Sequence, residues 1–166
     1  YYKIPTYTSL GFKNTSGIFI NRKNKYTKSE HVVTGFDYSL GAASKISIEG
    51  FLKKYSQYPI SVLDGVSLAN KGADFEVLGN EEIISNGEGK TYGLEFLFQQ
   101  KLLNNFYGIF SYTYFHSKFS GLTGEYLPSV WDSRNLISFV GGYKLQRNWE
   151  ISSRWRYLGE TPYVLS

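Results

Sequence analysis

Apolar and polar residues alternate along several long stretches of the chain. In the clearest stretch every second residue is apolar, at Tyr92, Leu94, Phe96 and Phe98. A period of two over about ten residues predicts β-strands, because successive side chains of a strand point to opposite faces. The strands of small sandwiches usually have about five or six residues. Strands of about 9–11 residues with one apolar, aromatic-rich face and one polar face are typical of outer-membrane β-barrels.

The alternation predicts long strands joined in turn by short turns and long connections. The expected strands are residues 31–40, 45–58, 90–102, 106–119, 135–145 and 149–158. The short turns are residues 41–44, 103–105 and 146–148, and the long connections are residues 59–89 and 120–134. Residues 1–28 are expected to form a loop with a short strand near 15–21. The predicted fold class is all-β: an antiparallel transmembrane β-barrel segment of about six to seven strands.

The rhythm of short turns and long connections also predicts an orientation in the membrane. Outer-membrane barrels have short periplasmic turns and long extracellular loops. The three short turns are therefore expected in the periplasm, and residues 59–89 and 120–134 outside the cell. The alternative is a soluble antiparallel protein such as a sandwich, and the strand length favours the barrel. The aromatic residues expected to face lipid include Phe96, Phe98, Phe110, Tyr112, Phe139 and Trp155.

Composition fits a barrel and excludes other classes. The chain has 15 Tyr, 12 Phe and 3 Trp, as the aromatic girdles of a barrel require. No run of about 18 apolar residues occurs, so no transmembrane helix is expected. The absence of Cys excludes disulfides and thiolate metal sites. The net charge of +4 combines a basic N-terminal stretch with an acidic stretch at 59–87, and this pattern is not that of a nucleic-acid-binding face.

The ends of the chain suggest a partial domain. Tyr1 is preceded by neither Met nor a signal peptide, although a membrane barrel must be exported. The last expected strand runs into a loop that ends at Ser166, and a closed barrel would need a further strand at that edge. We therefore expect residues 1–166 to be a partial outer-membrane β-barrel domain that forms an open sheet.

Several short segments resemble TonB-dependent outer-membrane receptors, in the order in which they occur there. These are Lys28-Ser29-Glu30-His31 leading into Gly35-Phe36-Asp37-Tyr38, the strand Ile48-Glu49-Gly50-Phe51-Leu52-Lys53-Lys54-Tyr55, and Gly89-Lys90-Thr91-Tyr92-Gly93-Leu94-Glu95. Leu127-Pro128 through Trp131-Asp132-Ser133-Arg134-Asn135 resembles a strand entry that often carries Asp-x-Arg-His, with Asn135 in place of His. Gly159-Glu160-Thr161-Pro162-Tyr163 resembles the turn after a late strand. The style rich in Lys, Asn and Tyr is similar to that of Bacteroidetes-type receptors.

The resemblance implies a late portion of a 22-stranded barrel, in the outer membrane of a Gram-negative bacterium. That family has an N-terminal plug domain and a TonB box, neither of which is visible in this sequence. The resemblance also implies energised import of a scarce nutrient: a ferric chelate, cobalamin, a glycan or a peptide. The implied partners are membrane lipid and lipopolysaccharide, the remainder of the barrel, a TonB-type energising complex and a surface lipoprotein, without nucleic acid. Cofactors are not expected.

Charged residues on the expected polar face are the candidate ligand-binding residues. They are Glu49, Lys53, Glu95, Arg154 and Arg156. The functional interpretation is a charged lumen wall that touches substrate or plug. The simpler interpretation, which we favour, is ion pairing between neighbouring strands in a wet interior.

Two groups of loop residues carry further candidate chemistry. The acidic residues Asp74, Glu76, Glu81 and Glu82 offer oxygen ligands for Ca²⁺, but their spacing matches no defined calcium loop, and a solvated acidic loop is the simpler interpretation. The basic residues Arg22, Lys23, Lys25 and Lys28 are suited to lipopolysaccharide phosphates if their loop faces outside. A polar loop that remains soluble explains these four equally well.

Catalysis has little support in the sequence. The two histidines, His31 and His116, are far apart in the chain and lack partners at metal-ligand spacing. The enzyme interpretation worth naming is a barrel hydrolase with Ser and His on its wall, but we expect no enzymatic activity. The alternative to the receptor is a non-energised outer-membrane barrel, either a porin or an adhesion or structural barrel with ligand-binding loops.

Overall fold

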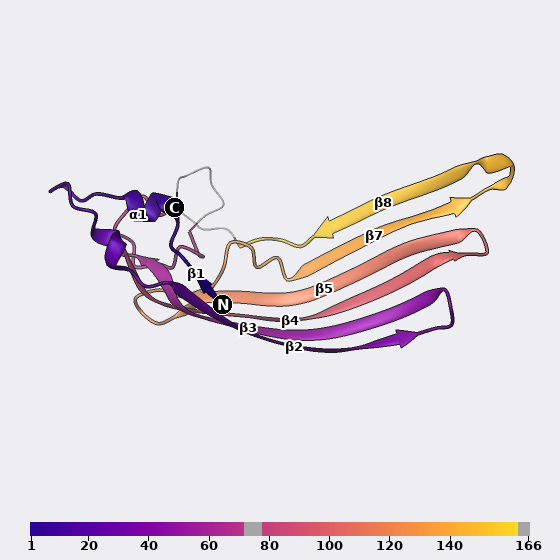
Figure 1. Ribbon diagram of the computed structural model, residues 1–166, viewed down its shortest axis with the longest axis horizontal. Helices are drawn as coiled ribbons and strands as arrows, with labels where there is room; N and C mark the ends of the chain where they lie inside the picture. Colours follow the sequence, from indigo (N-terminus) through magenta and orange to yellow (C-terminus); the bar gives the residue numbers. More distant parts are fainter. Residues whose placement is uncertain (72–77, 163–166) are drawn as a thin grey trace.

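The computed structural model describes residues 1–71 and 78–162, which form one antiparallel sheet with small helices (Figure 1). The strands are β1 (Tyr2–Lys3), β2 (Thr27–Ser39), β3 (Ser44–Ser61), β4 (Ile83–Leu103), β5 (Phe106–Ser120), β6 (Tyr126–Pro128), β7 (Asn135–Lys144) and β8 (Glu150–Leu158). The helical segments are α1 (Tyr7–Gly11), η1 (Ile20–Lys23) and η2 (Gln146–Asn148). In the described part of the chain, no helix is long and apolar enough to cross a membrane.

The six expected long strands are confirmed as β2, β3, β4, β5, β7 and β8. Each pairs antiparallel with the next long strand along the chain. The tight turns require unusual backbone conformations, and Asn104 and Asn105 between β4 and β5 have φ of 48° and 68°. Asn tolerates the left-handed region better than most residues, so these residue types suit a tight hairpin.

Several features of the fold differ from the sequence prediction. Residues 1–28, expected to form a loop, contain β1 and α1, and β2 begins at Thr27 rather than at residue 31. No strand forms at 15–21, because Ile20–Lys23 turns into a 3₁₀ helix and the Asn14 side chain accepts hydrogen bonds from the backbone of Ser16 and Ile18. β3 and β4 extend further than expected, so their connection is residues 62–82 rather than 59–89. Within the second connection, β6 pairs with the end of β5.

The sheet is open, as expected. The strand order is β1-β2-β3-β4-β5-β7-β8, with β6 on β5, and among the described strands β8 pairs with β7 alone. The strands lie side by side in one curved sheet, with the three short turns at one end (Figure 1). The N-terminal segment with α1 and the connection after β3 lies at the other end (Figure 1).

The cross-strand register separates two faces of the sheet. Phe36, Ile48, Phe96, Tyr112 and Ile137 are successive partners across β2 to β7, so they share one face. We call it the apolar face, and the opposite one the polar face. Side chains of the apolar face are open to the surroundings, with Phe36 60% and Leu94 59% exposed. An exposed apolar face of this extent marks contact with a membrane or with other protein.

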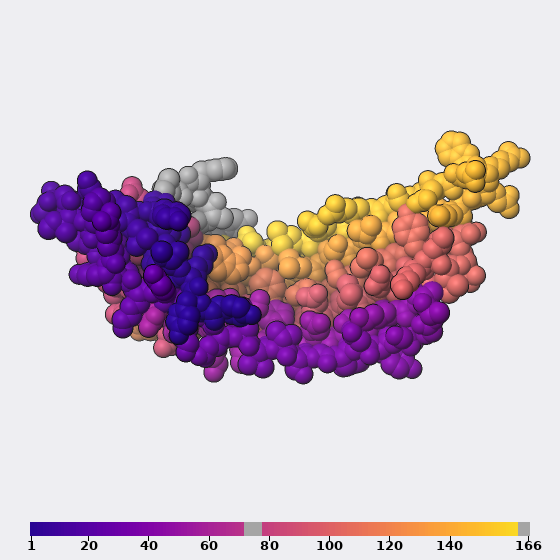
Figure 2. Space-filling model, viewed as in Figure 1, coloured from indigo at the N-terminus to yellow at the C-terminus, as the bar shows by residue number. Residues whose placement is uncertain are grey.

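The buried core is small and lies at the loop end of the sheet. The buried apolar side chains in the described residues are Ile60, Ala69, Ile83 and Phe119, from the ends of β3, β4 and β5 and from the connection after β3. The same strand ends meet the N-terminal segment in Figure 2, where the indigo atoms cover the left part of the sheet. Tertiary packing is therefore concentrated where the loops meet, and that is where a preformed site can be held.

Candidate functional site

All five candidate lumen residues lie on the polar face. Glu49 and Glu95 are direct partners across β3 and β4. Lys53 lies opposite Thr91, while Arg154 and Arg156 lie opposite Val140 and Ser138. Their contact with a ligand or plug stays a prediction.

The ion pairs expected for these five residues are not formed among the described strands. Within the described residues none of the five lies within ion-pair distance of an opposite charge, whereas Asp37 and Lys45 on the same face pair at 2.8 Å. The reason is the register, which sets carboxylate against carboxylate at Glu49 and Glu95. Like charges directly opposite each other destabilise a sheet, so this pair is suited to a cation from elsewhere.

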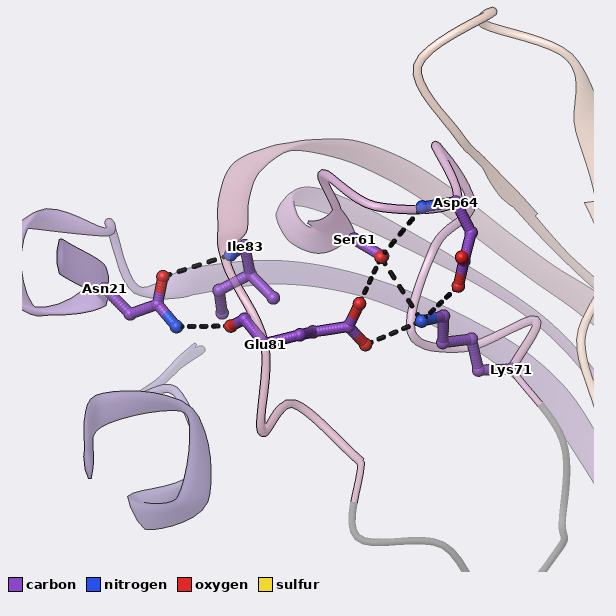
Figure 3. A network of polar contacts seen from close by, with 6 residues as sticks. All are labelled: Asn21, Ser61, Asp64, Lys71, Glu81 and Ile83. Atoms are coloured by element: carbon purple, nitrogen blue, oxygen red, sulfur yellow. Dashed lines mark hydrogen bonds and ion pairs between the residues drawn. The ribbon is translucent and has the colours of Figure 1, made fainter. Parts of the chain in front are cut away.

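The candidate calcium residues are only partly described. Asp74 and Glu76 lie outside the described residues, while Glu82 lies exposed just before β4. Glu81 is bound by Lys71, whose Nζ lies 2.6 Å from its Oε1 and also pairs with Asp64 (Figure 3). The described residues hold no group of three or more His, Cys, Asp or Glu placed for a metal ion.

The Lys71 network fixes the connection between β3 and β4. Burial lowers the pKa of Lys71, but hydrogen bonds and Coulomb attraction from Asp64 and Glu81 outweigh it and leave the pKa above its ordinary value. The Ser61 hydroxyl joins the network by donating to Glu81. Further along, the buried Asn21 donates to the carbonyl of Glu81 at 2.7 Å and accepts from the Ile83 amide at 3.0 Å (Figure 3). The N-terminal segment and this connection are therefore one packed unit.

An aromatic cavity lies beside that unit, on the polar face at the loop end. Its volume is about 620 Å³, within the ordinary range for small-molecule sites. Its ring-bearing lining residues are Tyr1, Tyr2, His31, Tyr55, Tyr58, Phe119 and Trp131. They come from Tyr1 at the N-terminus, from β1, β2, β3 and β5, and from the connection after β6. Of the described residues that line it, none is Asp or Glu.

The rings of the cavity form a continuous series of contacts. The Tyr1 ring lies 5.3 Å from His31, and His31 lies 6.3 Å from Tyr55. Phe119 then lies 5.3 Å from Tyr55 and 5.7 Å from Trp131, between ring centroids. Aromatic pairs at such separations attract each other, so the wall is arranged before a ligand arrives.

Two local features set the position of the cavity wall. Gly89 lies against Phe119, and a Cβ there would come within 2.3 Å of the ring, so only glycine leaves room for it. The Trp131 indole donates to the Ser117 hydroxyl at 3.0 Å, and the Ser117 amide donates to the buried Asp132 at 3.0 Å. Strand β5 thereby fixes the turn that carries Trp131.

The two histidines occupy different surroundings. His31 lines the cavity between Tyr1 and Tyr55. His116 lies on the apolar face as the partner of Tyr92, where its Nε2 meets the Tyr114 hydroxyl at 2.9 Å and its Nδ1 lies 3.8 Å from Asp132. The two ring nitrogens of His116 therefore face a phenol hydroxyl and a carboxylate. Neither nitrogen faces a serine hydroxyl, as in the Ser–His pair of a serine hydrolase.

Sequence reasoning missed the cavity because its rings come from positions between 1 and 131. The available signal was the aromatic content of the polar-face positions Tyr55 and Phe119, which alternation alone would make polar.

The apolar face has the height of a bilayer core. Along β4 it runs from Tyr92 to Leu102, which at about 3.3 Å per residue and a tilt of about 40° is about 25 Å tall. The edge of this face nearest the loop end carries Tyr92, Tyr114 and His116. The edge nearest the short turns carries Phe106 and Tyr143. Aromatic edges of this kind match the interfacial girdles of membrane barrels.

Comparison with solved structures agrees with this fold. The chain matches the pyoverdine outer membrane receptor FpvA from Pseudomonas aeruginosa PAO1, bound to pyoverdine, with a TM-score of 0.61 and 15% sequence identity. The match covers 95% of this chain and 21% of the receptor, so the chain spans about a fifth of that protein. No protein-family model and no curated protein sequence matches the chain. The fold is that of an antiparallel transmembrane β-barrel segment.

Proposed function

We propose that these residues form part of a TonB-dependent outer-membrane receptor that imports a scarce nutrient, and that the aromatic cavity binds it. The observation that carries the proposal is the preformed ring wall on the polar face, at the loop end of a barrel segment. The fold match to an outer-membrane receptor supports the same conclusion. The ligand is a ferric chelate, cobalamin, a glycan or a peptide, each with apolar or ring surface that stacks on aromatic side chains.

The proposal also assigns partners. The unpaired carboxylates of Glu49 and Glu95 meet a cationic group of a plug domain inside the barrel. Import draws on a TonB-type energising complex, and a surface lipoprotein meets the loops. The receptor is of the Bacteroidetes type, which the content of Lys, Asn and Tyr supports, and it resides in the outer membrane of a Gram-negative bacterium.

A non-energised barrel is the second candidate function. The same face and cavity would serve a porin or an adhesion barrel whose loops bind a ligand. The two candidates differ in one measurable property, because only the energised receptor loses uptake when the TonB-type complex is deleted.

Equilibrium binding to the full-length protein tests the cavity. A ferric chelate, cobalamin, an oligosaccharide and a peptide are titrated in turn. One of them should bind, and Tyr55→Ala or Trp131→Ala should weaken that binding about tenfold, as expected for loss of a stacked ring. Trp149→Ala, at the far end of the sheet, is the matched control and should bind normally. Cavity variants that bind as tightly as the control would refute the site.

A further inference from the structure

Three lysines lie side by side across the centre of the sheet. Lys54 on β3 is the register partner of Lys90 on β4, and Lys90 is the partner of Lys118 on β5. Partners in an antiparallel sheet share a face, and this row is two residues beyond Leu52, Tyr92 and His116, which belong to the apolar face. We call these three residues the lysine row.

The lysine row lies just past the edge of the apolar face that is nearest the loop end. Between Tyr92 and Leu102 the apolar face of β4 carries no charged residue, so the first charges that a lipid meets there on leaving the bilayer core are these lysines. Lys54 and Lys90 are exposed and Lys118 is half-buried. With strands about 4.8 Å apart, the backbone positions of the row span about 10 Å, the scale of one lipid headgroup.

Two carboxylates, Glu30 and Glu88, lie on the same face beside the lysine row, but both are held by other side chains. Within the described residues, none of its three members lies within ion-pair distance of a carboxylate. Glu30 lies opposite Lys54, but its carboxylate is 2.5 Å from the ammonium of Lys28. Lys90 instead lies 4.4 Å from the ring centre of Tyr126. Like charges directly opposite each other cost stability, so an external anion would relieve the row.

We infer that the lysine row binds the phosphates of a lipid in the outer leaflet, in the manner of lipid A of lipopolysaccharide. An ammonium is a strong point-charge partner for phosphate, and basic residues beside a bilayer attract anionic lipids. The row lies on the face opposite the aromatic cavity, so it is separate from the proposed nutrient site. The inference rests on the outer-membrane location proposed above.

The row is a better phosphate site than the basic residues of the N-terminal segment. Arg22 stacks on the Phe19 ring at 3.8 Å, and Lys28 pairs with Glu30. Arg22 lies in η1, outside the sheet, and the ammonium of Lys28 is engaged by a carboxylate on its own strand. The lysine row spans three adjacent strands, and their register sets its spacing.

Native mass spectrometry of the full-length barrel in detergent tests the inference. The probes are bisphosphorylated lipid A, its dephosphorylated form and inorganic phosphate. The test variant is Lys54→Gln/Lys90→Gln/Lys118→Gln. The matched control, Lys53→Gln/Lys101→Gln/Lys144→Gln, removes the same charge, with Lys53 on the opposite face of the same strand. A third variant, Lys54→Arg/Lys90→Arg/Lys118→Arg, retains the charge.

Wild type, control and Arg variant should bind lipid A and prefer its phosphorylated form. The Gln variant should bind it about a hundredfold more weakly, since three basic residues are lost from an anionic surface site. Equal binding by the Gln and control variants would overturn the inference, as would full displacement of lipid A by inorganic phosphate. If the Gln triple variant fails to fold, lipid A binding by Lys90→Gln alone is compared with that of the control variant. Insertion of the wild type into phosphatidylcholine vesicles, scored by heat modifiability, tests the membrane location separately.

Discussion

Glu49 on β3 stands directly opposite Glu95 on β4, so two carboxylates meet on the polar face of the sheet. Neither lies within ion-pair distance of a cation in the described part of the chain. An isolated sheet would be more stable without such a pair. Under the proposed function, a cationic group of the plug domain relieves this repulsion.

Replacing both carboxylates tests that interpretation. Glu49→Gln/Glu95→Gln should destabilise the full-length protein by about 1.5–3 kcal/mol, the value of hydrogen bonds to charged groups. Urea unfolding gives the difference, with Glu125→Gln in an exposed turn as the control. An unchanged or raised stability would mean that the carboxylates repel each other and bind nothing.

If the apolar face contacts lipid, an Arg substitution on that face should cost more stability than one on the polar face. Phe110 lies near the middle of that face, as partner of Phe98 and Phe139. Phe110→Arg should cost about 2–4 kcal/mol, because a charge near the bilayer midplane is expensive. Ser111→Arg, on the polar face of the same strand, should cost much less. Refolding into lipid vesicles at graded denaturant measures both, and equal costs would contradict lipid exposure.

Asn21 is the buried connector between the N-terminal segment and the connection after β3. Its amide donates to the carbonyls of Ser9 and Glu81, and its oxygen accepts from the Ile83 amide. Asn21→Ala should cost about 1–3 kcal/mol, because buried groups lose their partners. Hydrogen exchange at the Ile83 amide should accelerate, whereas the exposed Asn80→Ala should leave it unchanged. Unaltered exchange in Asn21→Ala would show that the segments are not coupled.

Alkaline pH should loosen the Lys71 network. The folded pKa of Lys71 lies above its ordinary value of 10.5, because the hydrogen bonds and charges of Asp64 and Glu81 outweigh desolvation. A raised pKa means that the contribution to stability is complete below about pH 10.5 and is lost as pH rises through the folded pKa. A fluorophore at Leu63→Cys, on an exposed position, should report the transition. The same label in a Lys71→Gln protein should show no such step.

Most of the sheet could be predicted from the sequence because period-two alternation is a local signal. Residues 106–119, for example, correspond to β5 nearly residue by residue. The strand near 15–21 failed because Asn14 and the residues after it satisfy their backbone hydrogen bonds locally. β4 begins at Ile83 rather than at the expected residue 90, because Gly87 and Gly89 weaken the strand signal although they pair with Tyr58 and Tyr55.

The lysine row and the carboxylate pair depend on the cross-strand register, which cannot be predicted from the alternation of apolar and polar residues. Lys54, Lys90 and Lys118 are 36 and 28 residues apart in the sequence, and only cross-strand pairing brings them into one row. The same is true of the facing Glu49 and Glu95. The polar face itself could be predicted, but which of its charges meet could not.

We expect one face of this sheet to meet lipid and the other to face an aqueous lumen. The chain contains no Cys, so single cysteines can carry a spin label at successive positions of β4 from Leu94 to Gln99. In vesicles, labels at Leu94, Phe96 and Phe98 should collide mainly with oxygen dissolved in lipid. Labels at Glu95, Leu97 and Gln99 should collide mainly with a water-soluble nickel chelate. A strict alternation between the two relaxants is the predicted result, and equal accessibility along β4 or the reverse alternation would contradict the account.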